Sequence, residues 1–361
     1  MNKNEQKIID LIKKDAYISQ QELADSLGLS RPSVANLISG LVRRGYIRGK
    51  AYVLNDLKQI VCVGGANLDR KVYVKDEIQL GTSNPIRTTK NAGGVARNIA
   101  ENLGRLGMDT TLLTVSGSDS EWNYIAEQSL PYMNLEDVTH FSKATTGSYT
   151  AVLDDDGDLL LGLADMDIFD LMIPEWIQQH VSLLQQAKCI LADLNCPKDT
   201  LQFLCKFAKS RDITLILVAV STPKMKHIPD KLGGLSWMIT NLDESEAYFQ
   251  CDLTPTEAVE KWLALGVENV VITKGKEGAV VGNKAEEIYH VPAIETREII
   301  DVTGAGDAFS SAVTYAWLEG ESLIDTTKAG VVNATRTLQT AYTVRRDLTA
   351  LQLQEDMEEL L

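Results

Sequence analysis

A change of hydrophobic pattern near residue 58 limits the possible folds of this 361-residue chain more than any other feature. Beyond it, short apolar runs such as 60–63, 213–218 and 269–273 alternate with stretches of helical periodicity such as 95–106. Apolar runs of this length are typical of strands buried on both faces, and their alternation with helices is typical of a parallel sheet covered by helices. Residues 58–361 are therefore predicted to form one α/β domain.

Two stretches of this domain depart from that rhythm, residues 71–89 and 147–163. The second contains Asp154-Asp155-Asp156-Gly157 between two alternating segments, which is typical of a hairpin turn. The acidic run lacks the ligand spacing and the distant glutamate of an EF-hand calcium loop, so a solvated turn is favoured over a metal site. Together the two stretches predict a small, separate β-sheet.

The first 57 residues follow a different pattern, that of three short helices. Ser19-Gln20-Gln21-Glu22 is a capping box that starts the second helix, Gly28 ends that helix, and Ser30 caps the third. Two helices joined in this way resemble a helix-turn-helix, and the alternating residues 45–54 predict a hairpin wing. The outer face of the third helix carries the candidate DNA contacts, which are Arg31, Ser33, Asn36 and Arg43.

Charge is divided unevenly between these two regions. The whole chain has a net charge of −15, but residues 1–57 carry +3 and the remainder −18. A basic segment favours phosphate contacts, whereas the acidic remainder argues against nucleic acid as the partner of the whole molecule. A net charge of +3 supports only weak DNA binding, and a dimer would strengthen the binding by doubling that charge. The alternative interpretation is a helical dimerisation module that touches no DNA.

Other features concern location and the available chemistry. The chain has no run of eighteen apolar residues and starts without a secretion signal, so we expect a cytoplasmic protein with no membrane partner. Its five cysteines form no CxxC pair, and its four histidines have no metal-ligand spacing. Reduced core thiols are therefore expected, and a carboxylate must carry any acid–base chemistry.

The segment from Asp301 to Phe309 concentrates the residues expected to do chemistry. Its small residues Gly304, Ala305 and Gly306 allow the backbone to approach an anion, and the following helix presents free N–H groups and the positive end of its dipole. Asp307 stands at the same place, where it can accept a proton from a hydroxyl that attacks a phosphate. The alternative is a glycine-containing helix start with a capping aspartate.

This segment and an earlier one resemble the signatures of the ribokinase-like (PfkB) family of carbohydrate and nucleoside kinases. Residues 301–307 match D-T-x-G-A-G-D except at Val302, and residues 93–100 match the N-terminal signature. The resemblance covers about residues 58–350 and implies a three-layer α/β/α sandwich with a small β-sheet lid, preceded by the winged helix-turn-helix. It also implies that Asp307 is the catalytic base and that Gly304, Ala305 and Gly306 form the anion hole.

The resemblance further implies which residues hold the ligands, which are a sugar diol, ATP, Mg²⁺ and a monovalent cation such as K⁺. A carboxylate can accept hydrogen bonds from two neighbouring hydroxyl groups, which suits a ribose. No G-x-x-x-x-G-K-[S/T] loop is present, so a P-loop kinase is not expected. The residues implied are Asn67, Asp69, Gly93, Gly94 and Asn98 for the sugar; Asn241, Glu244, Thr273, Gly275, Gly278 and Asn333 for ATP; Asn241 and Glu244, through water, for Mg²⁺; and Asp301 for the monovalent cation.

Within the family, three segments are most similar to pseudouridine kinases, namely residues 93–100, 163–168 and 192–195. The expected reaction transfers the γ-phosphate of ATP to the ribose 5′-hydroxyl of pseudouridine. Asp165 and Asp193 are the candidates for recognition of the base, and the alternative for both is hydrogen bonding within the lid or at a strand end. The pair Ala219-Val220 departs from the Asp-Pro expected after the strand at 213–218, which puts substrate or metal handling there in doubt.

Two other functions stay open at this point. The first is a kinase for ribose, fructose or a purine nucleoside, and the second is a nucleoside-sensing transcription regulator. Against a pure sensor, such a protein has no need of a proton acceptor beside the γ-phosphate. A homodimer is expected from the lid and from the two-fold symmetry usual for helix-turn-helix proteins.

Overall fold

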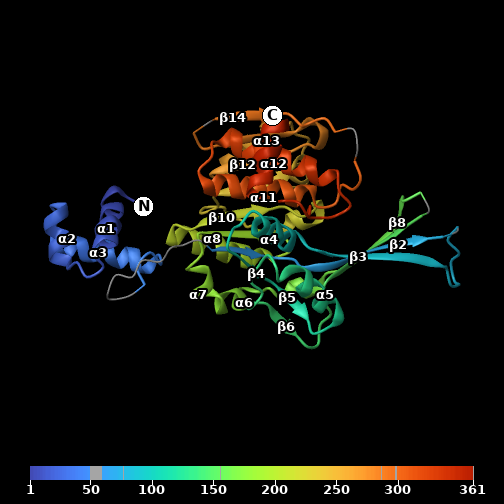
Figure 1. The fold of residues 1–361 in the computed structure, drawn as a ribbon, viewed down its shortest axis with the longest axis horizontal. Helices are drawn as coiled ribbons and strands as arrows, with labels where there is room; N and C mark the ends of the chain where they lie inside the picture. The colour runs from blue at the N-terminus through green and yellow to red at the C-terminus, as the bar shows by residue number, and fades with distance from the viewer. Residues whose placement is uncertain (49–58, 76, 155, 286, 297–298, 361) are drawn as a thin grey trace.

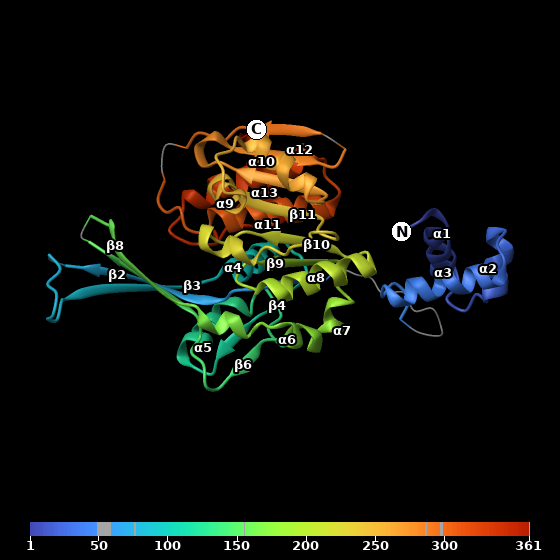
Figure 2. The ribbon, with the colours of Figure 1, turned by 180° about the vertical axis from the view of Figure 1, so that it is seen from behind.

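The computed structural model describes residues 1–48, 59–75, 77–154, 156–285, 287–296 and 299–360. It consists of an α/β body, an arm built of strands, and an N-terminal group of helices (Figure 1). Seen from the front and from behind, the N-terminal helices and the arm extend from opposite ends of the body (Figures 1 and 2). None of the helices in these described ranges is long and apolar enough to cross a membrane.

The body is built on one sheet whose described strands follow the order β14 (Ile288–Val291), β13 (Ala279–Asn283), β12 (Asn269–Thr273), β11 (Trp237–Asn241), β10 (Thr214–Val218), β9 (Cys189–Asp193), β1 (Ile60–Val63) and β4 (Thr110–Leu113). Neighbours from β12 to β4 are parallel, and β13 and β14 are antiparallel. Successive side chains of a strand point to opposite faces, so Ile60 and Cys62 enter one core and Val61 and Val63 the other. The sheet therefore needs helices on both sides.

Helices cover both apolar faces, which confirms the predicted three-layer α/β/α sandwich. One core receives side chains of α4 (Val95–Arg105), α5 (Ser120–Ser129), α11 (Ala305–Glu319) and α12 (Leu323–Leu338). The other receives those of α6 (Pro174–Gln179), α7 (Val181–Leu184), α8 (Lys198–Arg211), α9 (Leu242–Phe249) and α10 (Pro255–Ala264). Outside these layers lie α13 (Ala350–Leu360), which packs on α12, and the pair β5 (Val115–Gly117) and β6 (Thr139–Phe141).

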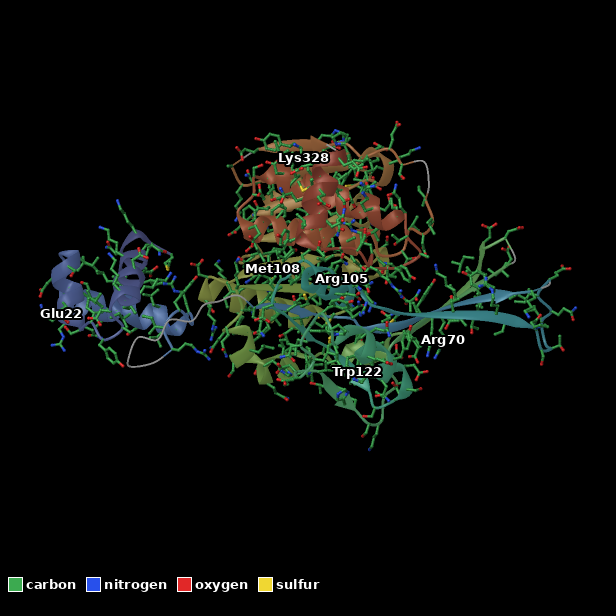
Figure 3. All side chains as sticks on the ribbon, viewed as in Figure 1. Glu22, Arg70, Arg105, Met108, Trp122 and Lys328 are labelled. Atoms are coloured by element: carbon green, nitrogen blue, oxygen red, sulfur yellow. The ribbon has the colours of Figure 1, made fainter. Side chains whose placement is uncertain are left out.

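The arm is a four-stranded sheet in the order β3 (Ile86–Gly93), β2 (Asn67–Val74), β7 (Ser148–Leu153) and β8 (Leu159–Asp165). These strands include the two stretches that depart from the α/β pattern, so the predicted small, separate sheet is confirmed. The described residues of the acidic run lie between β7 and β8, where the Asp154 N–H donates to the Asp158 carbonyl at 3.0 Å. Arg70 lies at the root of the arm (Figure 3). It pairs with Glu121 of the body at 2.6 Å.

The N-terminal helices are α1 (Lys3–Lys14), α2 (Gln20–Leu27) and α3 (Arg31–Arg43). The Ser19–Glu22 capping box and the left-handed Gly28, with φ +64°, confirm the predicted start and end of α2. Arg44 ties this region together through Glu5 at 2.7 Å and reaches Asp212 of the body at 3.4 Å. The predicted wing at 45–54 lies mostly outside the described residues.

Candidate active site

The carboxyl ends of the parallel strands meet at one edge of the sheet, where ligands bind in open α/β folds. The loop after β1, Asp193 at the end of β9, Asn241 at the end of β11 and Thr273 at the end of β12 all lie at this edge. The end of the arm and the start of α11 reach it as well, because Gly94, just after β3, lies against Gly65 of the loop after β1, and Asp307 of α11 accepts a hydrogen bond from Asn98 of α4. Most of the predicted site residues are therefore brought to one place.

Asp193 holds the loop after β1 against the start of α4. Its carboxylate has no exposed surface and accepts hydrogen bonds from the N–H groups of Gly65 and Ala96, each at 2.9 Å, and of Asn195 at 2.8 Å. Burial raises the pKa of Asp193, although these backbone bonds lower it. The prediction that Asp193 recognises the base is therefore wrong. The carboxylate is enclosed, and it caps α4 from a distant strand.

Gly93 and Gly94 allow the end of β3 to lie directly against its neighbours. A Cβ on Gly93 would overlap the carboxylate of Asp69, and one on Gly94, whose φ is +102°, would overlap the carbonyl oxygen of Gly65. Asp69 also accepts a hydrogen bond from Asn67 Nδ2 at 2.6 Å. Burial raises the pKa of Asp69 to about 6, opposed by the bond from Asn67 and by nearby positive charges. Asn67, Asp69, Gly93 and Gly94 therefore lie close together, and their assignment to the sugar stays a prediction.

Asp307 lies in the first turn of α11, beside Asn98 of α4. Its Oδ2 accepts a hydrogen bond from Asn98 Nδ2 at 2.8 Å, and Arg97 Nη1 donates to Asn98 Oδ1 at 3.2 Å. The Asp307 carboxyl keeps some exposed surface but is densely surrounded by protein atoms. This burial, with the nearby charges of Asp193 and Asp69, raises the pKa of Asp307 to about 7, while the bond from Asn98 lowers it. A carboxylate with such a pKa is well suited to accept a proton near neutral pH.

The backbone at the start of α11 is open to an anion. Gly304 precedes the helix with φ +84°, and a Cβ there would overlap the carbonyl oxygen of Thr343. No side chain caps this terminus, and within the described ranges the N–H groups of Gly306 and Asp307 have no hydrogen-bond partner. The space beside Gly306 holds no atom within 4 Å. Such a helix start can accept an anion, and the positive end of the helix dipole would favour it.

Asp301, predicted to bind a monovalent cation, faces donor groups instead. Its Oδ2 pairs with Lys71 Nζ at 2.5 Å, and its Oδ1 accepts from Thr303 N at 3.0 Å and Thr303 Oγ1 at 2.7 Å. Burial would raise the pKa of Asp301, but the bonds from Lys71 and Thr303 lower it overall. Val302, the departure from the family signature, is 69% exposed, so its side chain has no packing to satisfy.

Asn241 and Glu244 form the capping box of α9. Asn241 Oδ1 accepts from Glu244 N at 2.8 Å, and Glu244 Oε2 accepts from Asn241 N and Thr240 Oγ1, each at 2.9 Å. Burial raises the pKa of Glu244, while these bonds lower it. Among the described residues Glu244 Oε1 has no partner, so the box leaves one carboxylate oxygen for water bound to a cation. The predicted water-mediated Mg²⁺ contact fits this geometry.

The two predicted glycines of the loop after β12 have different surroundings. Gly275, with φ +47°, borders open space, which suits a close ligand. Gly278, with φ +91°, is required by packing, because a Cβ would overlap the carbonyl oxygen of Val291.

The prediction that Asn333 binds ATP is wrong. Its side chain has no exposed surface, donates to the Ala308 carbonyl at 2.9 Å, and accepts from Arg345 Nε at 2.9 Å.

Asp165 and Ala219 complete the set of residues singled out in the sequence. Asp165 is exposed at the end of β8, with Thr145 Oγ1 donating to it at 3.2 Å. Its side chain therefore remains accessible to a ligand. Ala219 and Val220 are partly buried and pack against the core, so apolar packing takes the place of the carboxylate expected there.

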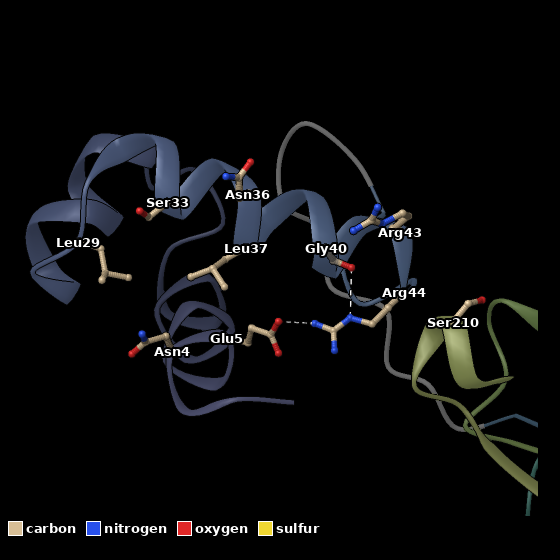
Figure 4. Close-up of a pocket in the computed structure, with 10 residues that line it drawn as sticks. All are labelled: Asn4, Glu5, Leu29, Ser33, Asn36, Leu37, Gly40, Arg43, Arg44 and Ser210. Atoms are coloured by element: carbon tan, nitrogen blue, oxygen red, sulfur yellow. Dashed lines mark hydrogen bonds and ion pairs between the residues drawn. The ribbon is translucent and has the colours of Figure 1, made fainter. Parts of the chain in front are cut away.

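The candidate DNA contacts Arg31, Ser33, Asn36 and Arg43 are all exposed on α3. Ser33, Asn36 and Arg43 line a shallow groove of about 520 Å³, shared with α1 (Figure 4). Ser210 of the body borders the same groove. One member has a local role too, because Ser33 N donates to the capping Ser30 Oγ at 3.3 Å.

Sequence reasoning missed three residues that support the site: Arg97, Lys71 and Thr343. Arg97 is 2% exposed and orients the Asn98 amide, while Glu101 balances its charge at 2.5 Å. The i,i+4 spacing of Arg97 and Glu101 was a usable signal. For Lys71 and Thr343 there was none, because their partners lie far away in the chain.

Two family models match the chain. One, described as pfkB family carbohydrate kinase, matches residues 57–348, and the other, described as winged helix-turn-helix DNA-binding, matches residues 1–48. Among curated proteins, the uncharacterized sugar kinase YeiI of Escherichia coli (strain K12) is 29% identical over 339 residues, covering 92% of this chain and 93% of that protein. The pseudouridine kinase of the same strain is 29% identical over 299 residues, covering 80% and 93%.

Solved structures show the same fold. A carbohydrate kinase from Agrobacterium tumefaciens superposes with a TM-score of 0.75 at 29% identity, covering 84% of this chain and 98% of that one. The Arabidopsis thaliana ribokinase complexed with ribose and ATP gives a TM-score of 0.74 at 20% identity, with 84% and 99% coverage. At that identity the second likeness supports the fold alone.

Proposed function

The chain belongs to the pfkB family of carbohydrate kinases, and from that membership we propose that it is a pseudouridine kinase. As a member it is a phosphotransferase with an alcohol group as acceptor. The proposed reaction converts ATP and pseudouridine to ADP and pseudouridine 5′-phosphate. The observation that carries it is the Asp307 carboxylate, held by Asn98 at an uncapped helix start beside Asp69. Similarity to the E. coli pseudouridine kinase supports the choice of substrate.

In this proposal Asp307 is the catalytic base. The ribose 5′-oxygen forms a bond to the γ-phosphorus as the bond from that phosphorus to the bridging oxygen breaks, and the hydroxyl proton passes to Asp307. The N–H groups of Gly306 and Asp307 stabilise the charge on the transferred group. Asp69 accepts hydrogen bonds from the 2′- and 3′-hydroxyls and so fixes the ribose. The Asn98 amide keeps enough of Asp307 ionised at neutral pH.

ATP and Mg²⁺ are the proposed cofactors. The open space at Gly275 and the neighbouring Thr273 would border the nucleotide, and Asn241 with Glu244 would hold water bound to Mg²⁺. When bound, the ion neutralises phosphate charge during transfer. Because ATP is the donor and the described cysteines are free thiols, we propose that the enzyme acts in the cytoplasm.

The arm is proposed to close over the substrate and to join two copies of the chain. Its edge strand β8 exposes four leucines, Leu159, Leu160, Leu161 and Leu163, each with about half of its surface accessible. An apolar edge strand of this kind is normally covered in the working molecule. Pairing of two arms in a homodimer would cover it. Sedimentation showing only monomer at micromolar concentration would contradict this.

A second function, DNA binding, is proposed for residues 1–57, with residues 58–361 as the kinase domain. The match to winged helix-turn-helix DNA-binding proteins and the exposed polar face of α3 favour it. A nucleoside-sensing regulator would combine the two domains. A kinase for ribose, fructose or a purine nucleoside is the alternative that keeps the chemistry.

The test is ADP release with Mg-ATP across pseudouridine, uridine, cytidine, adenosine, inosine, ribose and fructose. Asp307→Asn serves as the blank. We expect turnover with pseudouridine that the substitution abolishes. Turnover only with ribose or adenosine would overturn the substrate but keep the mechanism. Silence with all seven acceptors would favour the regulator.

A further inference from the structure

Lys71 joins the arm to the loop that builds the anion hole. It lies on β2, two residues beyond Asp69, and residues two apart on a strand point to the same face. Asp69 lies in the cluster with Asn67, Gly93 and Gly94, and Lys71 reaches Asp301, 230 positions further along the chain, at 2.5 Å. The side chains of this pair are only 31% and 20% exposed, so water screens them less than a surface pair.

Asp301 in turn organises the loop before α11. Its second oxygen accepts from the backbone and the hydroxyl of Thr303, at 3.0 and 2.7 Å. The next residue, Gly304, starts the segment whose N–H groups are proposed to bind the transferred phosphate. A shift of Asp301 would therefore move the donors that the transferred phosphate needs, and misplacement of such groups lowers rates strongly.

A monovalent cation at Asp301, as the family resemblance implies, does not fit these surroundings. Potassium needs acceptor oxygens, but within the described residues both Asp301 oxygens already face donors, one of them the ammonium of Lys71. A second cation beside that ammonium would be repelled, and the single charge of Asp301 is already balanced.

We propose that the Lys71 ammonium takes the place of this cation, so that the protein needs no potassium and the arm itself sets the anion hole. This inference rests on the proposed kinase function. Lys71 is a positioning residue, because it acts through Asp301 and not on the substrate. Binding of ribose at Asp69 and arrangement of residues 304–307 are thereby linked through one strand.

The experiment compares wild type with Lys71→Met in potassium chloride and in tetramethylammonium chloride at equal ionic strength. We expect wild-type kcat and Tm to be the same in both salts. Lys71→Met should lose about tenfold or more of kcat in tetramethylammonium chloride and regain part of it in potassium chloride, because the vacated place can then accept the ion. Its Tm should also rise in potassium chloride, a readout that needs no substrate.

Two further variants serve as controls. Lys75→Met removes an exposed arm lysine and should behave as wild type, and Lys71→Arg keeps the charge and should stay indifferent to potassium. Activation or thermal stabilisation of the wild type by potassium would overturn the inference, as would full turnover of Lys71→Met in both salts. If the wild type phosphorylates none of the acceptors, the proposed function fails, and the Tm comparison still decides the role of Lys71.

Discussion

Two helix starts in this molecule, those of α3 and α11, differ in how their backbone N–H groups are satisfied. Ser30 caps α3 with its own side chain, accepting from Ser33 N, so the terminus is closed and presents side chains to solvent. Gly304 begins α11, and among the described residues no side chain caps this start and the N–H groups of Gly306 and Asp307 have no hydrogen-bond partner. The exposed side chains of α3 are suited to contacting a surface such as DNA, whereas the open start of α11 is suited to holding an anion.

The difference extends to the charged groups nearby. Around α11 the carboxylates are crowded and buried, and burial raises the pKa of Asp307 to about 7 and that of Asp69 to about 6. On α3 the polar residues are exposed and spaced along one face. Substitutions at α11 should thus change catalysis or stability through buried contacts, and those at α3 should change only binding to a charged partner.

The largest effect is expected from Asp307→Asn. Removal of the base should lower kcat by about a thousandfold, within the range of general base catalysis, as measured by ADP release. DNA affinity should not change. Because burial raises the pKa of folded Asp307 to about 7, the unfolded chain, with a pKa of about 4, releases this proton first, so wild-type stability should fall as the pH rises from about 4 to about 7. The variant should lack that loss and melt higher at pH 8.

Asp230→Asn, which removes a surface carboxylate paired with Lys198, is the matched control and should leave kcat unchanged. Retention of more than a tenth of wild-type kcat by Asp307→Asn would contradict the assignment of the base.

Two glycine substitutions separate the open terminus from the packing behind it. Gly304→Ala forces a side chain into the Thr343 carbonyl at φ +84°, and should lower the free energy of unfolding by about 1–3 kcal/mol. Gly306→Ala meets no atom and adds a better helix former, so stability should rise by up to about 1 kcal/mol. Its methyl group, however, enters the space reserved for the phosphate, so kcat/KM should fall about tenfold, within the usual cost of losing transition-state stabilisation. Denaturant unfolding and steady-state kinetics measure both. Equal losses of stability in the two variants would break the comparison.

DNA binding by the exposed face of α3 is tested by Arg31→Ala and Arg43→Ala. If each guanidinium neutralises one phosphate, each loss should lower the slope of log affinity against log salt by about 0.9. The kinetics of phosphorylation should be unchanged, and Lys3→Ala, on α1, should keep the wild-type slope. Fluorescence anisotropy with duplex DNA over a salt series measures this. Identical slopes for all four proteins would favour the dimerisation module.

Sequence reasoning succeeded where a structure is specified by neighbours in the chain. The Ser19–Glu22 box, the left-handed Gly28 and the turn at Asp154 depend on hydrogen bonds within a few residues, and each was predicted correctly. The strands of the body followed from short apolar runs, because a sheet covered on both faces needs little else.

Sequence reasoning failed where one residue type can either bind a ligand or hold the fold together. Asp193 and Asp69 are both aspartates at the carboxyl edge of the sheet, but only the fold shows that Asp193 is enclosed by three backbone N–H groups. Asn333 was assigned to ATP although it links α12 to Ala308 and Arg345. Such contacts join residues that are far apart in the chain, so no local pattern records them.

The smallest expected effect concerns the amide that faces Asp307. The bond from Asn98 lowers the pKa of Asp307, so Asn98→Ala should raise it and move the acid limb of kcat/KM to higher pH by up to about one unit. Asn98→Asp replaces the donor with a second carboxylate and should move the limb further in the same direction. The order wild type, Ala, Asp is the result to look for, because loss of a sugar contact alone would lower kcat/KM at every pH without shifting the limb. A limb that stays in place in both variants would show that some group other than Asp307 sets it, and the open terminus of α11 would then hold the phosphate without supplying the base.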